Sequence, residues 1–163
     1  MNISFILLLA FLLAGTLAYS GLCSAAIGDP VPQFAISSPS FKNNGYMTSE
    51  FGCRGQNKSP ALQWENPPAG TYCFSIVFRD LNVTWIHWVI TDIPASYTGL
   101  PSDIPPRAVW NDGIRQDKNS WNHNGYGGPC PPKGTHQYEF EITAFDKHNK
   151  VLGNAIMVVS SDG

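Results

Sequence analysis

Glycine and proline recur so closely along this chain that few segments are long enough for an amphipathic helix. Fifteen glycines and thirteen prolines are spread over 163 residues. Proline removes a backbone donor and fixes φ, and glycine weakens a helix interior, so a 3.6-residue apolar repeat has little room to develop. Short runs with a two-residue apolar repeat occur instead, separated by turn sequences. This pattern predicts an all-β sandwich or barrel.

Three of these runs have a clear register. We expect strands at 74–80, 85–91 and 136–145. In the first and third runs, one face is apolar and the other mostly polar; the predicted inward faces are Phe74, Ile76, Phe78 and Asp80, and His136, Tyr138, Phe140, Ile142 and Ala144. Glu139 belongs to the predicted outer face. In the second run strict alternation places His87 and Trp88 on opposite faces, and because both faces are apolar we expect a central strand that is covered on both sides.

The first 25 residues resemble a secretory signal peptide. An almost wholly apolar run from Ile3 to Ala18 is followed by small residues between Ser20 and Ala26. The run is short for a membrane span, which needs about 20 residues. We therefore expect a signal peptide at 1–25, one mature domain at 26–163, and a secreted or periplasmic protein. The formal net charge of −2, without a basic run, does not favour nucleic acid as a partner.

Three cysteines remain after the expected cleavage, namely Cys53, Cys73 and Cys130. In an oxidising compartment two of them can pair, and we predict Cys53 with Cys73. The alternative is that all three are small buried side chains without a bridge. Cys130 is also considered as a nucleophile with His136 as its base, but the prolines on both sides favour a structural role.

Asp80, His87 and His136 stand in register with large apolar residues, where an ionisable group without a partner is costly. We therefore expect them to contact each other or a ligand, against the alternative of three separately satisfied core residues. A glycine- and proline-rich loop at 125–134 precedes His136. Two imidazoles beside a carboxylate can bind a phosphate, a carboxylate or a metal, although no His/Cys metal-binding spacing is present.

Several ordered motifs carry a family resemblance. They are Phe51-Gly52-Cys53-Arg54-Gly55-Gln56-Asn57-Lys58-Ser59-Pro60-Ala61-Leu62-Gln63-Trp64, His87-Trp88, Asp92-Ile93-Pro94, Gly125-Tyr126-Gly127-Gly128-Pro129-Cys130-Pro131-Pro132 and His136-Gln137-Tyr138. Together they resemble the phosphatidylethanolamine-binding protein (PEBP) family, in particular its bacterial Raf-kinase-inhibitor-like branch, from about Phe34 to Phe145. The resemblance implies a Greek-key β-sandwich with long loops and a small anion pocket for phosphate or phospholipid head groups. The pocket positions that it implies are Asp80, Trp85, His87, Gly128, Pro129, Pro131, His136 and Tyr138.

The chain departs from the family pattern in three places. The family's usual Asp-Pro-Asp-Ala-Pro is here Asp80-Leu81-Asn82-Val83-Thr84, which should loosen that wall of the pocket and alter the choice of head group. Gln137 stands where arginine is usual. The chain ends at Gly163, before the family's C-terminal strand and helix, so we expect a sandwich without that edge. Asn82-Val83-Thr84 is also a candidate glycosylation sequence.

The sequence leaves three functions open. The favoured one is a secreted or periplasmic binding protein, not an enzyme and without a cofactor, that holds a phosphate-bearing small molecule or a phospholipid head group. The alternative is a metal-assisted hydrolase that uses Asp80, His87 and His136. The third is a protein that inhibits or modulates a kinase or protease partner through the long irregular loop at 97–124.

Overall fold

The computed structural model describes residues 32–163. The signal peptide expected at 1–25 and the first residues of the expected mature domain lie outside the described residues. Among residues 32–163, no helix has the length and apolar character that a membrane crossing requires.

A large sheet forms one layer of the described domain. Its strand order is β2-β9-β8-β4-β5-β7, and only the β2–β9 pair is parallel. The strands span Gly45–Tyr46 (β2), Cys73–Asp80 (β4), Trp85–Pro94 (β5), Arg115–Gln116 (β7), His136–Phe145 (β8) and Val151–Ser161 (β9). The three predicted strands are therefore confirmed, and the second of them continues beyond its expected end.

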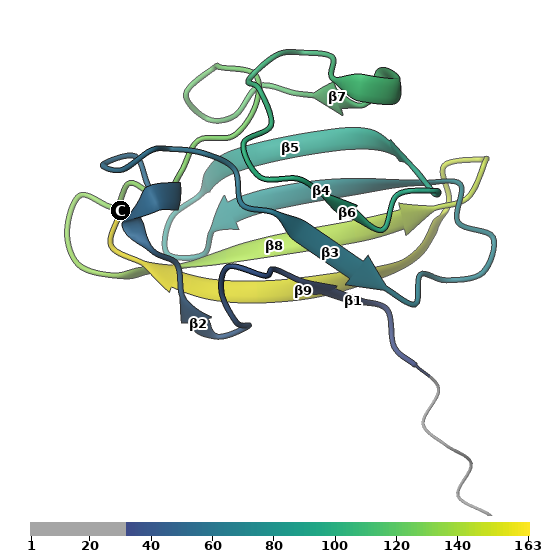
Figure 1. Cartoon of the computed structure of the whole chain (residues 1–163), viewed down its shortest axis with the longest axis horizontal. Coiled ribbons are helices and arrows are strands. Elements are labelled where there is room, and N and C mark those ends of the chain that lie inside the picture. Colours follow the sequence, from purple (N-terminus) through teal and green to yellow (C-terminus); the bar gives the residue numbers. More distant parts are fainter. Residues whose placement is uncertain (1–31) are drawn as a thin grey trace, which may run out of the picture. The chain divides into compact units, whose positions relative to one another are not determined.

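A second, smaller sheet has the order β1-β3-β6, and its strands span Ala35–Ser37 (β1), Leu62–Glu65 (β3) and Gly99–Leu100 (β6). Figure 1 shows β3 and β6 crossing over the face of the large sheet. The only helices in residues 32–163 are two single-turn 3-10 segments, η1 at Ser49–Phe51 and η2 at Asn111–Gly113. The prediction of an all-β sandwich is confirmed.

Aromatic side chains fill the space between the two sheets. The Trp64 ring of β3 lies 5.3 Å from the Phe74 ring of β4, and the Phe78 and Phe140 rings stack at 4.0 Å on neighbouring strands of the large sheet. The side chains of Phe74, Phe78 and Phe140 are almost fully buried, as the alternation on β4 and β8 predicts. Each buried aromatic side chain of this kind contributes about 1.5–3 kcal/mol of transfer free energy to folding.

The outer face of the large sheet carries an ionic cluster. Arg79 on β4 donates to Glu139 and to Glu141 on β8, and the second of these distances is 2.8 Å. Glu139 has the predicted outward register, yet it is only 9 % exposed. Its partner Arg79 covers it, which a strand pattern alone cannot indicate.

The predicted alternation on β5 is wrong at His87 and Trp88, because a β-bulge interrupts the pairing with β4. Trp88 pairs with Phe78 and Ile86 pairs with Arg79, so His87 is an extra residue without a partner on β4. Both His87 and Trp88 are buried, with exposed fractions of 2 % and 0 %. A bulge of this kind redirects side chains and is common beside functional sites.

The edge of the large sheet at β9 is partly covered. β2 pairs in parallel with the last part of β9, where Gly45 and Tyr46 lie opposite Val159 and Ser160. The Asn43 side chain also accepts a hydrogen bond from the Val158 amide at 2.9 Å. Short strands and side chains that cap an edge limit its pairing with other chains.

Candidate functional site

A cavity of about 400 Å³ opens where β4, β5 and β8 meet the loop that precedes β8. We keep for it the name anion pocket from the sequence prediction and define it by its lining residues, which are Asp80, Val83, Trp85, His87, Trp121, Cys130, Pro131, Pro132 and His136. Its volume lies within the range of about 300–1,000 Å³ that is usual for small-molecule sites. No lysine or arginine is among these residues, so any positive charge in the pocket must come from the imidazoles.

Sheet register brings the first members together. Asp80 at the end of β4 lies opposite Trp85 on β5 and opposite Tyr138 on β8. Opposed residues of antiparallel strands present their side chains to the same face, so these three share one side of the sheet. His136 begins β8 on that same face, two residues before Tyr138.

Asp80 and His136 form a pair at the pocket wall. The His136 Nδ1 lies 2.7 Å from the Asp80 Oδ2, and both side chains are largely buried. The other carboxylate oxygen, Oδ1, accepts from the backbone amides of Asn82 and Val83 at 2.7 and 3.3 Å. Because a carboxylate only accepts, Nδ1 carries the hydrogen and the Nε2 side of the ring is left for the pocket.

His87 is oriented by the loop instead of by a carboxylate. Its Nδ1 lies 2.8 Å from the Gly127 carbonyl oxygen, which also only accepts, so Nδ1 again carries the hydrogen. The Gly127 amide donates back to the His87 carbonyl at 2.9 Å. Burial lowers the pKa of His87, against the opposing effects of the Gly127 carbonyl and the Asp80 charge. The ring is therefore neutral near pH 7, with an Nε2 that has no hydrogen-bond partner in residues 32–163.

Two buried donors of the site also lack partners among the described residues. They are the Trp85 indole Nε1 and the Tyr138 hydroxyl. Burial and the nearby Asp80 carboxylate raise the pKa of Tyr138, so its hydroxyl keeps its proton and remains a donor. Unsatisfied buried donors are rare in folded proteins and indicate a partner such as water or a ligand.

The glycine- and proline-rich loop is fixed by contacts with the segment after η1. The Gly128 amide donates to the Asn57 side chain at 2.7 Å, and the Pro129 carbonyl accepts from the Cys53 amide at 3.0 Å. A Cβ on Gly128 would collide with the carbonyl oxygen of Phe51. Glycine is required there because two backbone segments approach each other closely.

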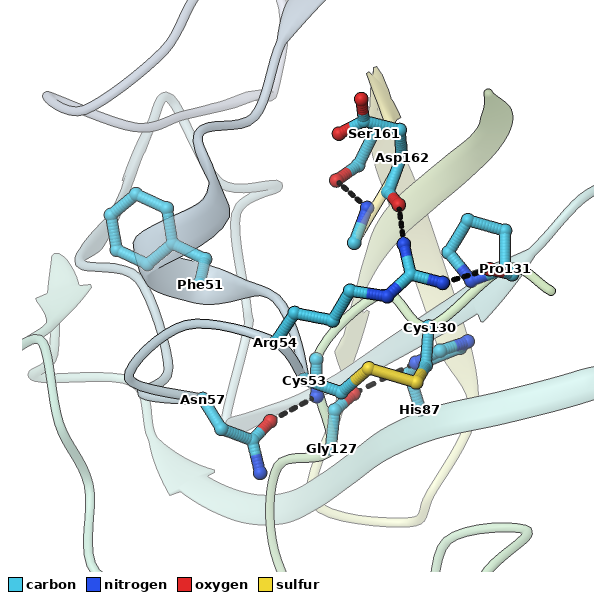
Figure 2. The surroundings of a disulfide bond; sticks show 12 residues. Phe51, Cys53, Arg54, Asn57, His87, Gly127, Cys130, Pro131, Ser161 and Asp162 are labelled. Carbon is cyan, nitrogen blue, oxygen red and sulfur yellow. Dashed lines mark hydrogen bonds between the residues drawn. A yellow bond between two sulfur atoms is a disulfide. The ribbon is translucent and has the colours of Figure 1, made fainter. Parts of the chain in front are cut away.

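The predicted Cys53–Cys73 disulfide is wrong. The structure pairs Cys53 with Cys130, whose Cα atoms are 5.4 Å apart, and leaves Cys73 as the free cysteine of residues 32–163. Cys73 is the first residue of β4. Cys53 lies in the turn after η1, and the fold places that turn against the pocket loop that carries Cys130. Figure 2 shows this disulfide beside Arg54, which donates to the carbonyls of Pro131 and Asp162.

Five of the eight predicted pocket residues line the anion pocket, namely Asp80, Trp85, His87, Pro131 and His136. Tyr138 lies behind them, with its ring centroid 5.2 Å from His87. Gly128 and Pro129 do not line the pocket and act as loop supports. Trp121 also lines the pocket and was not predicted from the sequence; its ring meets those of Trp85 and His87 edge-on at 5.3 and 5.0 Å. It lies in the irregular segment 97–124, where no periodic pattern could single it out.

Among residues 32–163, no group of three or more His, Cys, Asp or Glu side chains is placed to hold a metal ion. Asp80 faces His136, while His87 faces a backbone carbonyl. The site can present two oriented imidazole nitrogens to one small group.

The fold is a β-sandwich with a small pocket at the end of its central strands, and comparison with known proteins identifies the family. Residues 37–159 match the profile of the family described as phosphatidylethanolamine-binding protein. The chain belongs to this family. It is 35% identical over 114 residues to a UPF0098 protein of Methanothermobacter thermautotrophicus, an alignment that covers 68% of this chain and 76% of that protein.

Two further comparisons agree. The Escherichia coli protein YbcL is 36% identical over 124 residues, which covers 68% of each chain. Its crystal structure, described as that of a new member of the mammalian PEBP family, matches with a TM-score of 0.71 and 27% identity over 81% of this chain and 99% of that one. LppC of Mycobacterium tuberculosis, which is provisionally named a lipoprotein, is 35% identical over 115 residues covering 66% of this chain and 53% of LppC.

Proposed function

We propose that this chain is a binding module, not an enzyme, that holds a phosphate-bearing head group or small molecule in the anion pocket. The observation that carries the proposal is the matched orientation of two imidazoles. His87 and His136 both line the pocket; each uses Nδ1 for a fixed internal partner and leaves Nε2 without a hydrogen-bond partner in residues 32–163. Family membership supports the same ligand class, since the family takes its name from phosphatidylethanolamine binding.

An anion would change the protonation of the site. Near pH 7 the His87 Nε2 carries a lone pair and no hydrogen, so it cannot donate to a phosphate oxygen. A bound anion stabilises the imidazolium, and its Nε2–H then donates a charge-assisted hydrogen bond. Binding is therefore coupled to proton uptake at His87.

The rest of the pocket suits a head group whose phosphate is only one part. Trp85, Trp121, Pro131, Pro132 and Val83 give the pocket apolar walls. Apolar walls with a few oriented polar groups are typical of small-molecule sites. The polar groups would fix the phosphate, while the walls would cover the neighbouring carbon atoms of the ligand.

We also propose that the protein acts outside the cytoplasm. Support comes from the signal-like segment at 1–25, from the Cys53–Cys130 disulfide and from the provisional lipoprotein name of the relative LppC. Disulfides persist in oxidising compartments and are rare in the cytosol. An exposed Asn82 on the pocket rim keeps glycosylation there as a prediction for a eukaryotic secretory pathway.

Isothermal titration calorimetry with glycerophosphoethanolamine and with inorganic phosphate tests the binding proposal. The wild-type protein should bind both ligands, and His87→Ala and His136→Ala should each weaken binding by about 10- to 150-fold, the loss of one charge-assisted hydrogen bond. His148→Ala serves as the matched control, because His148 is exposed in the turn between β8 and β9. Circular dichroism confirms that each variant is folded.

Equal affinity of wild type and both pocket variants would refute the proposal. His136→Ala should disturb packing less than His87→Ala, since the His136 side chain is 15% exposed whereas His87 is 2% exposed. A loss of binding in His148→Ala of the same size would also count against it, because that residue lies outside the pocket.

A further inference from the structure

A second cavity of about 400 Å³ adjoins the anion pocket. The two cavities share Trp121 and Cys130 in their walls, so Trp121 and the disulfide separate them. The second cavity is further lined by Asn57, Asn119, His123, Asn124, Tyr126 and Pro106. A ligand that fills the anion pocket and extends past Trp121 would enter it.

The second cavity is lined by uncharged residues that offer both hydrogen-bond donors and hydrogen-bond acceptors. Its lining contains no Lys, Arg, Asp or Glu. Asn124 uses its Nδ2 on the Gln116 carbonyl at 2.7 Å, which leaves its Oδ1 as an acceptor. Asn57 uses its Oδ1 on the Gly128 amide, which leaves its Nδ2 as a donor. The His123 ring is exposed and has no hydrogen-bond partner within residues 32–163, so it can act in either role.

The wall between the cavities is rigidly held. Asn119 is buried, and its Oδ1 accepts from the amides of Trp121 and His123 while its Nδ2 donates to the Gly125 carbonyl at 3.1 Å. The Trp121 ring packs against Gly127, where any Cβ would collide with it. Trp121 is nevertheless 38% exposed. An indole that is fixed yet accessible is a pre-organised contact surface for a ligand.

We propose that the second cavity binds an uncharged polyhydroxylated ring, a sugar or cyclitol, carried by the same ligand whose phosphate occupies the anion pocket. This inference rests on the proposed function of that pocket. Hydroxyl groups donate and accept, which matches the mixed amide and imidazole atoms. The C–H face of such a ring can lie on the Trp121 indole. A charged group would enter without a counter-charge, which is costly in a partly buried site.

Calorimetry with methyl phosphate and glucose 6-phosphate tests the second cavity, because the two probes share a phosphate monoester and differ in the ring. Glucose 6-phosphate should bind about tenfold more tightly, the gain from one or two net hydrogen bonds. His123→Ala should remove about three- to tenfold of the affinity for glucose 6-phosphate and leave methyl phosphate within about twofold. His148→Ala should change neither.

NMR with methyl glucoside examines the second cavity separately, through the Trp121 indole and His123 ring signals. Equal affinity for the two phosphates, with no shift by methyl glucoside, overturns the sugar site and leaves the anion pocket intact. Shifts by methyl glucoside without binding of either phosphate support the sugar site and overturn the anion pocket. Failure of all three probes overturns both.

Co-sedimentation with phosphatidylcholine vesicles that contain phosphatidylinositol identifies the source of the ring. Pelleting that His123→Ala reduces assigns the site to a lipid head group. A protein that stays in the supernatant and still prefers glucose 6-phosphate over methyl phosphate has a free sugar phosphate as its ligand. Both of these results support a polyol phosphate as the ligand. A preference for glucose 6-phosphate over methyl phosphate that His123→Ala leaves unchanged refutes the proposed sugar site.

Discussion

The Cys53–Cys130 disulfide makes a quantitative prediction about stability. The two cysteines are 77 positions apart in the sequence. A cross-link over a loop of that length removes chain entropy from the unfolded state worth about 4.5 kcal/mol at 25 °C. Measured losses on removing native disulfides from small secreted domains are about 2–5 kcal/mol. We expect the double substitution Cys53→Ser and Cys130→Ser to lower the free energy of unfolding by an amount in that range.

Guanidinium chloride denaturation under non-reducing conditions, followed by tryptophan fluorescence, measures this loss. Cys53 is half-buried and Cys130 is exposed, so the serine hydroxyls remain near water and the loss reports the cross-link. Cys73→Ser is the matched control, with an expected change below about 1 kcal/mol because no bridge is removed. A loss below about 1 kcal/mol in the double variant, or peptide mapping that links Cys53 to Cys73, would refute the reasoning.

Three further predictions concern the pocket and its loop. Affinity for sulfate should rise as pH falls, by at most about tenfold per pH unit, because burial lowers the pKa of His87 in the free protein and a bound anion raises that pKa. The affinity should begin to rise at the His87 pKa of the complex and level off below the His87 pKa of the free protein. Calorimetry across pH 5–8 measures this dependence. Asp80→Asn should lower the free energy of unfolding by about 1–3 kcal/mol, since an amide N–H replaces an acceptor opposite His136. Gly128→Ala should cost about 1–3 kcal/mol in denaturation through a backbone clash, more than Gly134→Ala, where the added methyl meets open space and only the positive φ is penalised.

Two outcomes would contradict these predictions. Sulfate binding that is independent of pH, or tighter at high pH, would show that no imidazole takes up a proton on binding. Denaturation midpoints of Asp80→Asn and Gly128→Ala within error of wild type would show that neither the carboxylate–imidazole pair nor the close backbone approach stabilises the fold.

The sequence predicts the strand faces well where one face is buried and the other is exposed. The inward register of Phe74, Phe78, Tyr138 and Phe140 follows from alternation, because hydrophobic burial specifies register strongly in such strands. The same logic correctly places Asp80 beside His136, since both stand at core-facing positions. For these elements the local pattern and the tertiary structure agree.

The sequence could not predict three other features, and each depends on contacts between distant segments. The bulge at His87 adds a residue to β5 without any glycine or proline to signal it. The Cys53–Cys130 bridge depends on how the turn after η1 meets the pocket loop, and cysteine positions alone leave several pairings open. Trp121 reaches the pocket from an irregular segment fixed by the buried Asn119.

The central claim is that His87 and His136 meet an anion through their Nε2 atoms, and long-range ¹H–¹⁵N NMR of the imidazoles tests it most directly. During titration with glycerophosphoethanolamine, the His87 Nε2 signal should move toward the imidazolium range and the His136 Nε2 signal should shift, while Nδ1 of each ring keeps its bonded hydrogen. The His148 signals should stay fixed. Saturation with ligand that leaves both Nε2 signals unchanged would contradict the account.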